Sequence, residues 1–151
     1  MTSATRARIL AVTVFFGILD AIMKMLALRS FPDDSQAQGI ASLALHHNYG
    51  IAFNIPVPLY AVIPFTIAVL VFFAGFAYHD WSMHVARSMA SCMVIIGALG
   101  NLVDRVVHGF TTDWLILLER SAVNISDGII LVGILLFLWY SEHTPQVSDS
   151  H

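Results

Sequence analysis

Charged side chains are scarce in this 151-residue chain, at 11% of the residues, while hydrophobic residues make up 58%. An ordinary soluble domain carries about 25% charged residues. A soluble fold of this length could not hide so much apolar surface from water. The composition therefore predicts a small integral membrane protein, and we expect residues 1–151 to form one domain.

Lysine and cysteine each occur once, and these shortages exclude several functions. A net charge of −3 with a single lysine argues against nucleic acid as a partner, because phosphate-binding surfaces need clustered Lys and Arg. The lone Cys92 excludes an internal disulfide and any multi-cysteine zinc site. His46 and His47 are adjacent, so they point in different directions, and no further ligand set with metal spacing accompanies them. We therefore expect no metal site at these histidines.

Four apolar stretches are long enough to cross a bilayer as helices, which takes about 20 residues each. They run roughly over residues 9–28, 57–78, 86–108 and 126–141. The first stretch follows Arg6 and Arg8 and so has the outline of a secretory signal peptide. Asp20 and Lys24 oppose that interpretation, because their i,i+4 spacing makes them a compensating pair on one helical face. We predict an all-α membrane protein built as a four-transmembrane-helix bundle.

The segment between the first two spans has a different character. It is mixed and polar, with alternating residues over 40–45, which predicts a small extracytoplasmic β-like or amphipathic segment at the membrane surface. The polar tail, residues 141–151, is expected to lack regular structure. Four spans put both termini on one side, and Arg6 and Arg8 favour a cytoplasmic N-terminus, although the arginine count at the two faces is nearly even.

The stretch from Gly97 to Asp127 concentrates ionisable residues, among them Asp104, Asp113 and Asp127. Such residues are costly in or beside membrane segments, so their clustering indicates a functional site. The third span ends on the side where the fourth begins, which puts Asp113 and Asp127 at the same membrane face. Two carboxylates held close together cannot both ionise easily, so one keeps a proton. A general acid and a general base in one site could hydrolyse a membrane-borne peptide.

Other interpretations of these acids stay open at this point. The aspartates could instead pair with Arg105 and Lys24 to hold the bundle together. Spacing also does not decide which two of Asp104, Asp113 and Asp127 would form a catalytic pair. A proton-coupled carrier would more often place acids near the bilayer centre or show repeated halves, and we find no internal repeat. A structural membrane protein would need no acid pair at one face.

The polar residues fall into short sequence motifs, here called boxes. In the content and order of these boxes, the chain resembles the bacterial lipoprotein signal peptidases, or type II signal peptidases, over nearly its whole length. The matching residues are Asp20 and Lys24; Asn48, Gly50, Ala52 and Phe53; Gly100, Asn101, Asp104, Arg105, Gly109 and Asp113; and Asn124, Asp127 and Gly133. Each box is short, but their order on a four-span chain is specific.

The resemblance implies an aspartic endopeptidase that removes the signal peptide of diacylglyceryl-modified prolipoproteins by cleaving just before the lipid-bearing cysteine. It implies that Asp113 and Asp127 are the catalytic pair. The residues given substrate-binding or supporting roles are Asp20, Lys24, Asn48, Asn101, Asp104, Arg105 and Asn124. It also implies a monomer without metal or cofactor, surrounded by membrane lipids. The location would be the bacterial cytoplasmic membrane, with the active site on the extracytoplasmic side.

The chain departs from the usual family pattern at several positions. Ala21 and Met23 stand where Gln and Thr are usual, and Val123 replaces Phe before the final box. The connection from Trp114 to Val123 looks a few residues shorter than is typical. A divergent paralogue with another membrane peptide client is therefore an alternative, as is a non-enzymatic small membrane protein.

Overall fold

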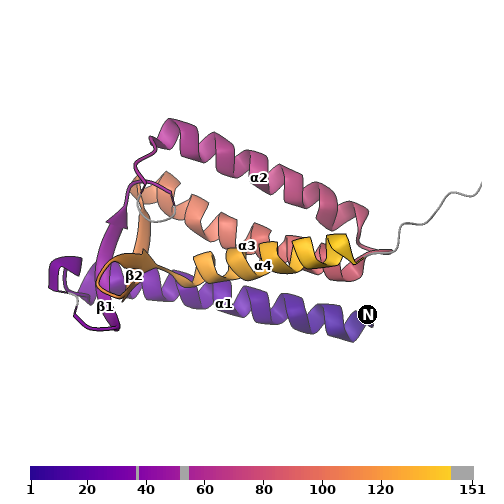
Figure 1. Cartoon of the computed structure of the whole chain (residues 1–151), viewed down its shortest axis with the longest axis horizontal. Helices are drawn as coiled ribbons and strands as arrows, with labels where there is room; N and C mark the ends of the chain where they lie inside the picture. Colours follow the sequence, from indigo (N-terminus) through magenta and orange to yellow (C-terminus); the bar gives the residue numbers. More distant parts are fainter. Residues whose placement is uncertain (37, 52–54, 144–151) are drawn as a thin grey trace, which may run out of the picture.

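The computed structural model describes residues 1–36, 38–51 and 55–143, and it contains four long helices with a small sheet at one end of the bundle (Figure 1). The helices are α1 (Ser3–Ser30), α2 (Leu59–His79), α3 (Val85–His108) and α4 (Ile125–Glu142). All four are long and apolar enough to cross a membrane. The predicted four-helix membrane bundle is confirmed, and Ala52 and Phe53 of the second box lie outside the described residues.

The helix ends differ slightly from the predicted spans, for local reasons. α1 starts six residues before the apolar stretch, because Thr2 caps it by accepting a hydrogen bond from the backbone N–H of Thr5. α3 stops at Gly109, whose φ of 83° suits a residue without Cβ. α4 continues through Glu142, one residue past the predicted span, and residues 144–151 of the expected polar tail lie outside the described part.

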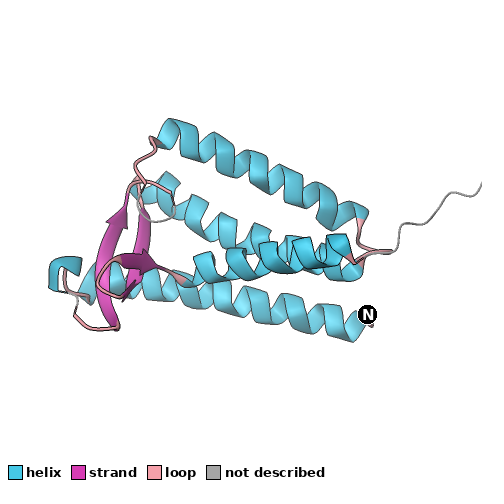
Figure 2. Cartoon of the chain, viewed as in Figure 1, coloured by secondary structure: helices cyan, strands magenta, loops and turns pink. Residues whose placement is uncertain are grey.

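A three-stranded antiparallel sheet covers the end of the bundle opposite the N-terminus (Figure 2). Its strand order is β1 (Ala41–Asn48), β2 (Thr111–Leu117) and β3 (Ser121–Val123). The β-like segment expected between the first two spans is therefore real, but it pairs with a hairpin between α3 and α4 that the sequence analysis treated as a plain connection. A short 3-10 helix, η1 (Asp34–Gln36), precedes β1.

Small residues let α3 and α4 pack closely. A Cβ on Gly97 would lie 2.7 Å from the backbone oxygen of Ser126, and one on Gly133 would lie 2.8 Å from Val94 Cγ2. This agrees with the expectation that small residues in the third span permit close packing. Because these contacts bring the first turn of α4 against α3, they also fix where the residues of that turn lie.

The apolar core sits at the end of the bundle away from the sheet. Phe73, Ala90, Val94 and Phe137 form a buried cluster from α2, α3 and α4, with the rings of Phe73 and Phe137 5.2 Å apart. At the same end, the buried Asp80 accepts two hydrogen bonds from Arg87, whose proximity holds the pKa of that carboxyl below its usual range. The sheet end of the bundle is left for polar side chains.

Candidate active site

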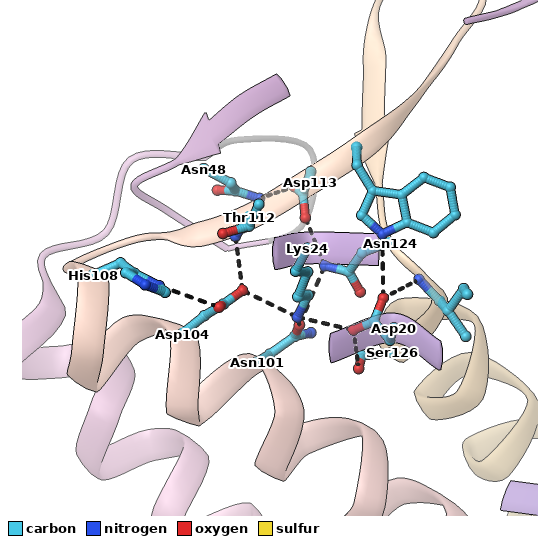
Figure 3. A network of polar contacts seen from close by, with 12 residues as sticks. Asp20, Lys24, Asn48, Asn101, Asp104, His108, Thr112, Asp113, Asn124 and Ser126 are labelled. Atoms are coloured by element: carbon cyan, nitrogen blue, oxygen red, sulfur yellow. Dashed lines mark hydrogen bonds and ion pairs between the residues drawn. The ribbon is translucent and has the colours of Figure 1, made fainter. Parts of the chain in front are cut away.

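The polar residues singled out in the sequence converge where the sheet meets the helices, and Figure 3 shows most of them. They come from five separate elements: α1, β1, α3, β2, and the cap and first turn of α4. Most are buried, and the exposed fraction of Asp113 is 0%. The hydrogen bonds and ion pairs divide them into two groups with different electrostatics.

The first group is neutralised by Lys24. Its Nζ lies 3.0 Å from Asp20 Oδ2 and 3.1 Å from Asp104 Oδ2, and it donates a 2.8 Å hydrogen bond to Asn101 Oδ1. All three charged side chains are buried. The predicted pair of Asp20 and Lys24 is thus confirmed, and Asp104 joins it from α3.

Asp20 also braces the start of α4 against α1. Its carboxylate accepts hydrogen bonds from the backbone N–H of Ile125 at 2.8 Å, from the Ser126 hydroxyl at 2.6 Å and from Trp114 Nε1 at 3.4 Å. Sequence reasoning did not single out Ser126, although a small hydroxyl residue beside Asp127 was the available signal. Asp20 therefore positions the helix turn that carries Asp127.

Asp104 and Arg105 point in different directions and contact separate segments. Asp104 accepts a 2.9 Å hydrogen bond from the backbone N–H of Thr112 and lies 3.4 Å from His108 Nδ1. Arg105 donates from Nη2 to the backbone oxygen of Gly50 at 3.1 Å. Asp104 thus fixes the start of β2, and Arg105 fixes the chain that follows β1.

The second group, Asp113 and Asp127, forms no ion pair with a cationic side chain within the described residues. Asp113 accepts hydrogen bonds from Asn48 Nδ2 at 3.0 Å and from Asn124 Nδ2 at 2.6 Å, and within the described residues it forms no ion pair. Burial raises the pKa of Asp113 to about 6, with a further contribution from the charge of Asp127 and opposition from the two amides. Asp113 is therefore a carboxyl group that holds its proton more readily than usual.

Asp127 is held by hydrogen bonds of the α4 cap, and among the described residues it forms no ion pair. Its Oδ1 accepts from Asn101 Nδ2 at 2.8 Å, and its Oδ2 accepts from the Asn124 backbone N–H at 3.1 Å. The Asn124 side chain accepts in return from the Asp127 backbone N–H at 3.0 Å, which completes a capping box. Asn124 therefore touches both Asp113 and Asp127.

The structure thus separates the acids that spacing alone left equivalent. Lys24 neutralises Asp20 and Asp104, so these two acids help to hold the bundle together. Asp113 and Asp127 are instead oriented by asparagine amides and form no ion pair among the described residues. Two unneutralised carboxyl groups that influence each other's protonation can act as a general acid and a general base.

The adjacent histidines diverge. His46 contacts Asp34 through Nδ1, while the His47 ring packs 4.3 Å from the ring of Phe110. In the part of the chain that the structure describes, no group of three or more His, Cys, Asp or Glu side chains is placed to hold a metal ion.

Comparison with known proteins gives a consistent result. The sequence profile of the signal peptidase (SPase) II family matches residues 12–142. The lipoprotein signal peptidase of Thermodesulfovibrio yellowstonii is 30% identical over 128 residues, which cover 81% of this chain and 86% of that protein. That of Halothermothrix orenii is 27% identical over 132 residues, covering 83% and 90%. A solved bacterial membrane enzyme superposes with a TM-score of 0.79 at 21% identity, covering 99% of this chain and 96% of the other, and so supports the fold.

Proposed function

The chain belongs to the signal peptidase II family, and from that premise we propose that it removes signal peptides from lipid-modified prolipoproteins by an aspartic mechanism. Membership makes it a membrane-spanning peptidase of lipoprotein processing. The proposal adds that Asp113 and Asp127 are the catalytic residues and that the bond broken precedes the lipid-bearing cysteine.

The observation that carries the proposal is the division of the four aspartates at the sheet end of the bundle, of which Asp20, Asp104 and Asp113 are buried and Asp127 is half-buried. Lys24 compensates Asp20 and Asp104, so neither is available as a free base. Asp113 and Asp127 receive hydrogen bonds from amide and backbone donors, which orient a carboxyl group without fixing its charge. A peptidase pair needs this arrangement, because one member must be able to hold the proton that the other releases.

The reaction then follows ordinary acid–base chemistry. The ionised carboxylate takes a proton from water as the water oxygen attacks the scissile carbonyl carbon, and the protonated carboxyl polarises the carbonyl oxygen. The C–N bond breaks as the leaving amine is protonated. The products are the signal peptide with a new carboxyl terminus and the mature chain with a free amine on its lipidated cysteine. The pair titrates as a unit, so no fixed protonated member is assigned.

The location of the site suits a substrate at the membrane boundary. Asp113 lies on the strand that follows α3, and Asp127 lies in the first turn of α4, so both are at the end of the bundle opposite Arg6 and Arg8. With those arginines on the cytoplasmic side, the pair faces outward from the bacterial cytoplasmic membrane. One chain supplies every residue of the proposed site, so we propose a monomer within the lipid bilayer.

The decisive experiment measures cleavage of a diacylglyceryl-cysteine precursor peptide in detergent, followed by mass spectrometry. Asp113→Asn and Asp127→Asn should each lower kcat by about 10²–10⁴-fold, since asparagine keeps the shape but cannot move the proton. Glu142→Gln, at the far end of α4, is the matched control and should cleave normally. Wild-type turnover in either aspartate variant would overturn the assignment.

The lipid requirement separates this function from that of a paralogue with another client. Burial of an acyl chain contributes about 0.8 kcal/mol per CH₂, so the lipidated precursor should be strongly preferred over the same peptide without lipid. Equal processing of the two peptides would point to a different membrane peptide as the natural substrate.

A further inference from the structure

A small cavity of about 110 Å³ lies among the segments outside the membrane spans. Its lining comes from three segments that meet there, namely η1, β1 and the β2–β3 hairpin. The polar residues that line it are Asp34, His46, Asn48, Glu119 and Arg120. The cavity therefore combines hydrogen-bonding groups from parts of the chain that are distant in sequence.

This cavity borders the proposed catalytic pair. Asn48 lines it and also donates the 3.0 Å hydrogen bond to Asp113 Oδ2. His46, another lining residue, is the partner of Asp113 in the β1–β2 register. If Asp113 contacts the scissile bond, a side chain only a few residues from that bond can reach the cavity. The signal peptide occupies the membrane, so the residues that follow the cysteine are the ones on this side.

Some of the polar groups that line the cavity have hydrogen-bond or ion-pair partners, and others have none. Asp34 is paired with His46, and Glu119 Oε1 accepts a 2.7 Å hydrogen bond from the backbone N–H of Gly39. The side chain of Arg120 is exposed and forms no hydrogen bond or ion pair within the described residues. Nε2 of His46 is enclosed without a partner. The groups left for a ligand are thus a guanidinium, whose planar donors match a carboxylate, and an imidazole nitrogen.

The hairpin turn that carries Arg120 is held in place. The backbone N–H of Arg120 donates to Leu117 O at 3.1 Å, and that of Leu118 donates to Ile40 O at 2.9 Å. Leu118 and Glu119 have φ values of 52° and 58°, a left-handed conformation that is uncommon for such residues. Strained backbone of this kind persists where the surrounding structure enforces it, often beside a ligand site. The turn therefore presents Arg120 from a preorganised backbone.

We propose that this cavity is a substrate subsite for an acidic side chain within the first residues after the lipid-bearing cysteine, with Arg120 binding its carboxylate. His46 lines the same cavity beside Arg120, and its Nε2 is enclosed there without a partner among the described residues, so the imidazole adds a second polar contact for the substrate side chain. The inference rests on the proposed peptidase function and adds a sequence preference to it.

The test compares lipidated peptides that differ only in Glu, Gln or Lys at the first, second or third position after the cysteine. For the wild type, kcat/KM should favour Glu over Gln about 10-fold at one of these positions, the size expected for one charge-assisted hydrogen-bonded contact. Arg120→Gln should bring that ratio to about 1 while leaving cleavage of the Gln peptide unchanged. The control Arg29→Gln, at an exposed arginine outside the cavity, should keep the preference.

A binding measurement keeps this test independent of catalysis. In an Asp127→Asn background, the Glu peptide should bind more tightly than the Gln peptide, and Arg120→Gln should remove the difference. Equal kcat/KM for Glu and Gln at all three positions, or a preference for Lys, would overturn the subsite and leave the peptidase function standing. Continued cleavage by the aspartate variants would overturn the function, and the binding comparison would still decide whether Arg120 selects acidic peptides.

Discussion

Removal of the Lys24 charge should strongly destabilise the protein. Lys24→Met would leave Asp20 and Asp104 buried without their cation, at exposed fractions of 1% and 6%. Two contacts of 3.0 and 3.1 Å each correspond to a gross attraction of about 5 kcal/mol at an effective dielectric constant near 20. Desolvation offsets part of this, so the expected loss in free energy of unfolding is about 3–5 kcal/mol.

A double-mutant cycle shows whether the loss comes from the stranded carboxylates. Asp104→Asn alone should cost about 1–2 kcal/mol, because Lys24 keeps Asp20 and Asn101 as partners and the asparagine oxygen can still accept from Thr112. The double variant should be no less stable than Lys24→Met, since one of the two unpaired acids is gone. The coupling between the sites should therefore be about 1–3 kcal/mol.

The assay is denaturant unfolding in detergent micelles, with peptide cleavage measured on the same samples. Arg29→Met, in the last turn of the same helix, is the control and should change stability by less than about 0.5 kcal/mol. Strict additivity in the cycle, or a loss below about 1 kcal/mol for Lys24→Met, would refute the view that Lys24 neutralises the two acids. Asp104→Asn should retain activity, and a stable but inactive Asp104→Asn would make Asp104 a candidate for the catalytic pair in place of Asp113.

Two further predictions concern Asp113 and the α3–α4 contact. The pKa of Asp113 is about 6 in the folded protein against an ordinary 3.8, so the free energy of unfolding falls as the pH rises from about 4 to about 6. Asp113→Asn should therefore raise the free energy of unfolding by up to about 3 kcal/mol at pH 7–8 and leave it unchanged near pH 3.5. Thermal unfolding at the two pH values checks this. Gly133→Ala would push a Cβ to 2.8 Å from Val94 Cγ2 and should cost about 1–3 kcal/mol, whereas Gly75→Ala, with open space around it, should be neutral or stabilising in the same measurement.

The order of the spans could be predicted because hydrophobic length is a property of the sequence alone. Helices crossing lipid must satisfy their backbone internally, so long apolar stretches identify them, and α2 and α3 begin and end within two residues of prediction. The pairing of Asp20 with Lys24 was equally accessible, since i,i+4 neighbours meet on any helix. α4 also begins and ends within one residue of its predicted span, whereas α1 begins six residues earlier than predicted, because its first turns are polar and carry no hydrophobic signal.

The hairpin between α3 and α4 was not predicted, because its strand β2 shows no polar–apolar alternation. Thr111 to Trp114 are all buried, so the period of two that identifies a half-exposed strand is missing. The contact of Asp104 with Thr112 could not be predicted either, because its donor is a backbone N–H and the pattern of side chains gives no information about it. The cavity at Arg120 depends on this hairpin and so on the same tertiary pairing.

The sequence by itself determined that the chain spans a membrane four times and that its acids gather at one end, since both follow from composition and position along helices. It also carried the ordered boxes that relate the chain to a peptidase family. Only the tertiary structure decided which acids are free. Lys24 reaches Asp104 across the α1–α3 contact. Asn48 from β1, Asn101 from α3 and Asn124 from the cap of α4 meet at Asp113 and Asp127. Apart from the local Asp20–Lys24 pair and the Asn124–Asp127 cap, packing between distant segments decides which carboxylate meets a cation and which meets an amide, and spacing along the chain does not report it.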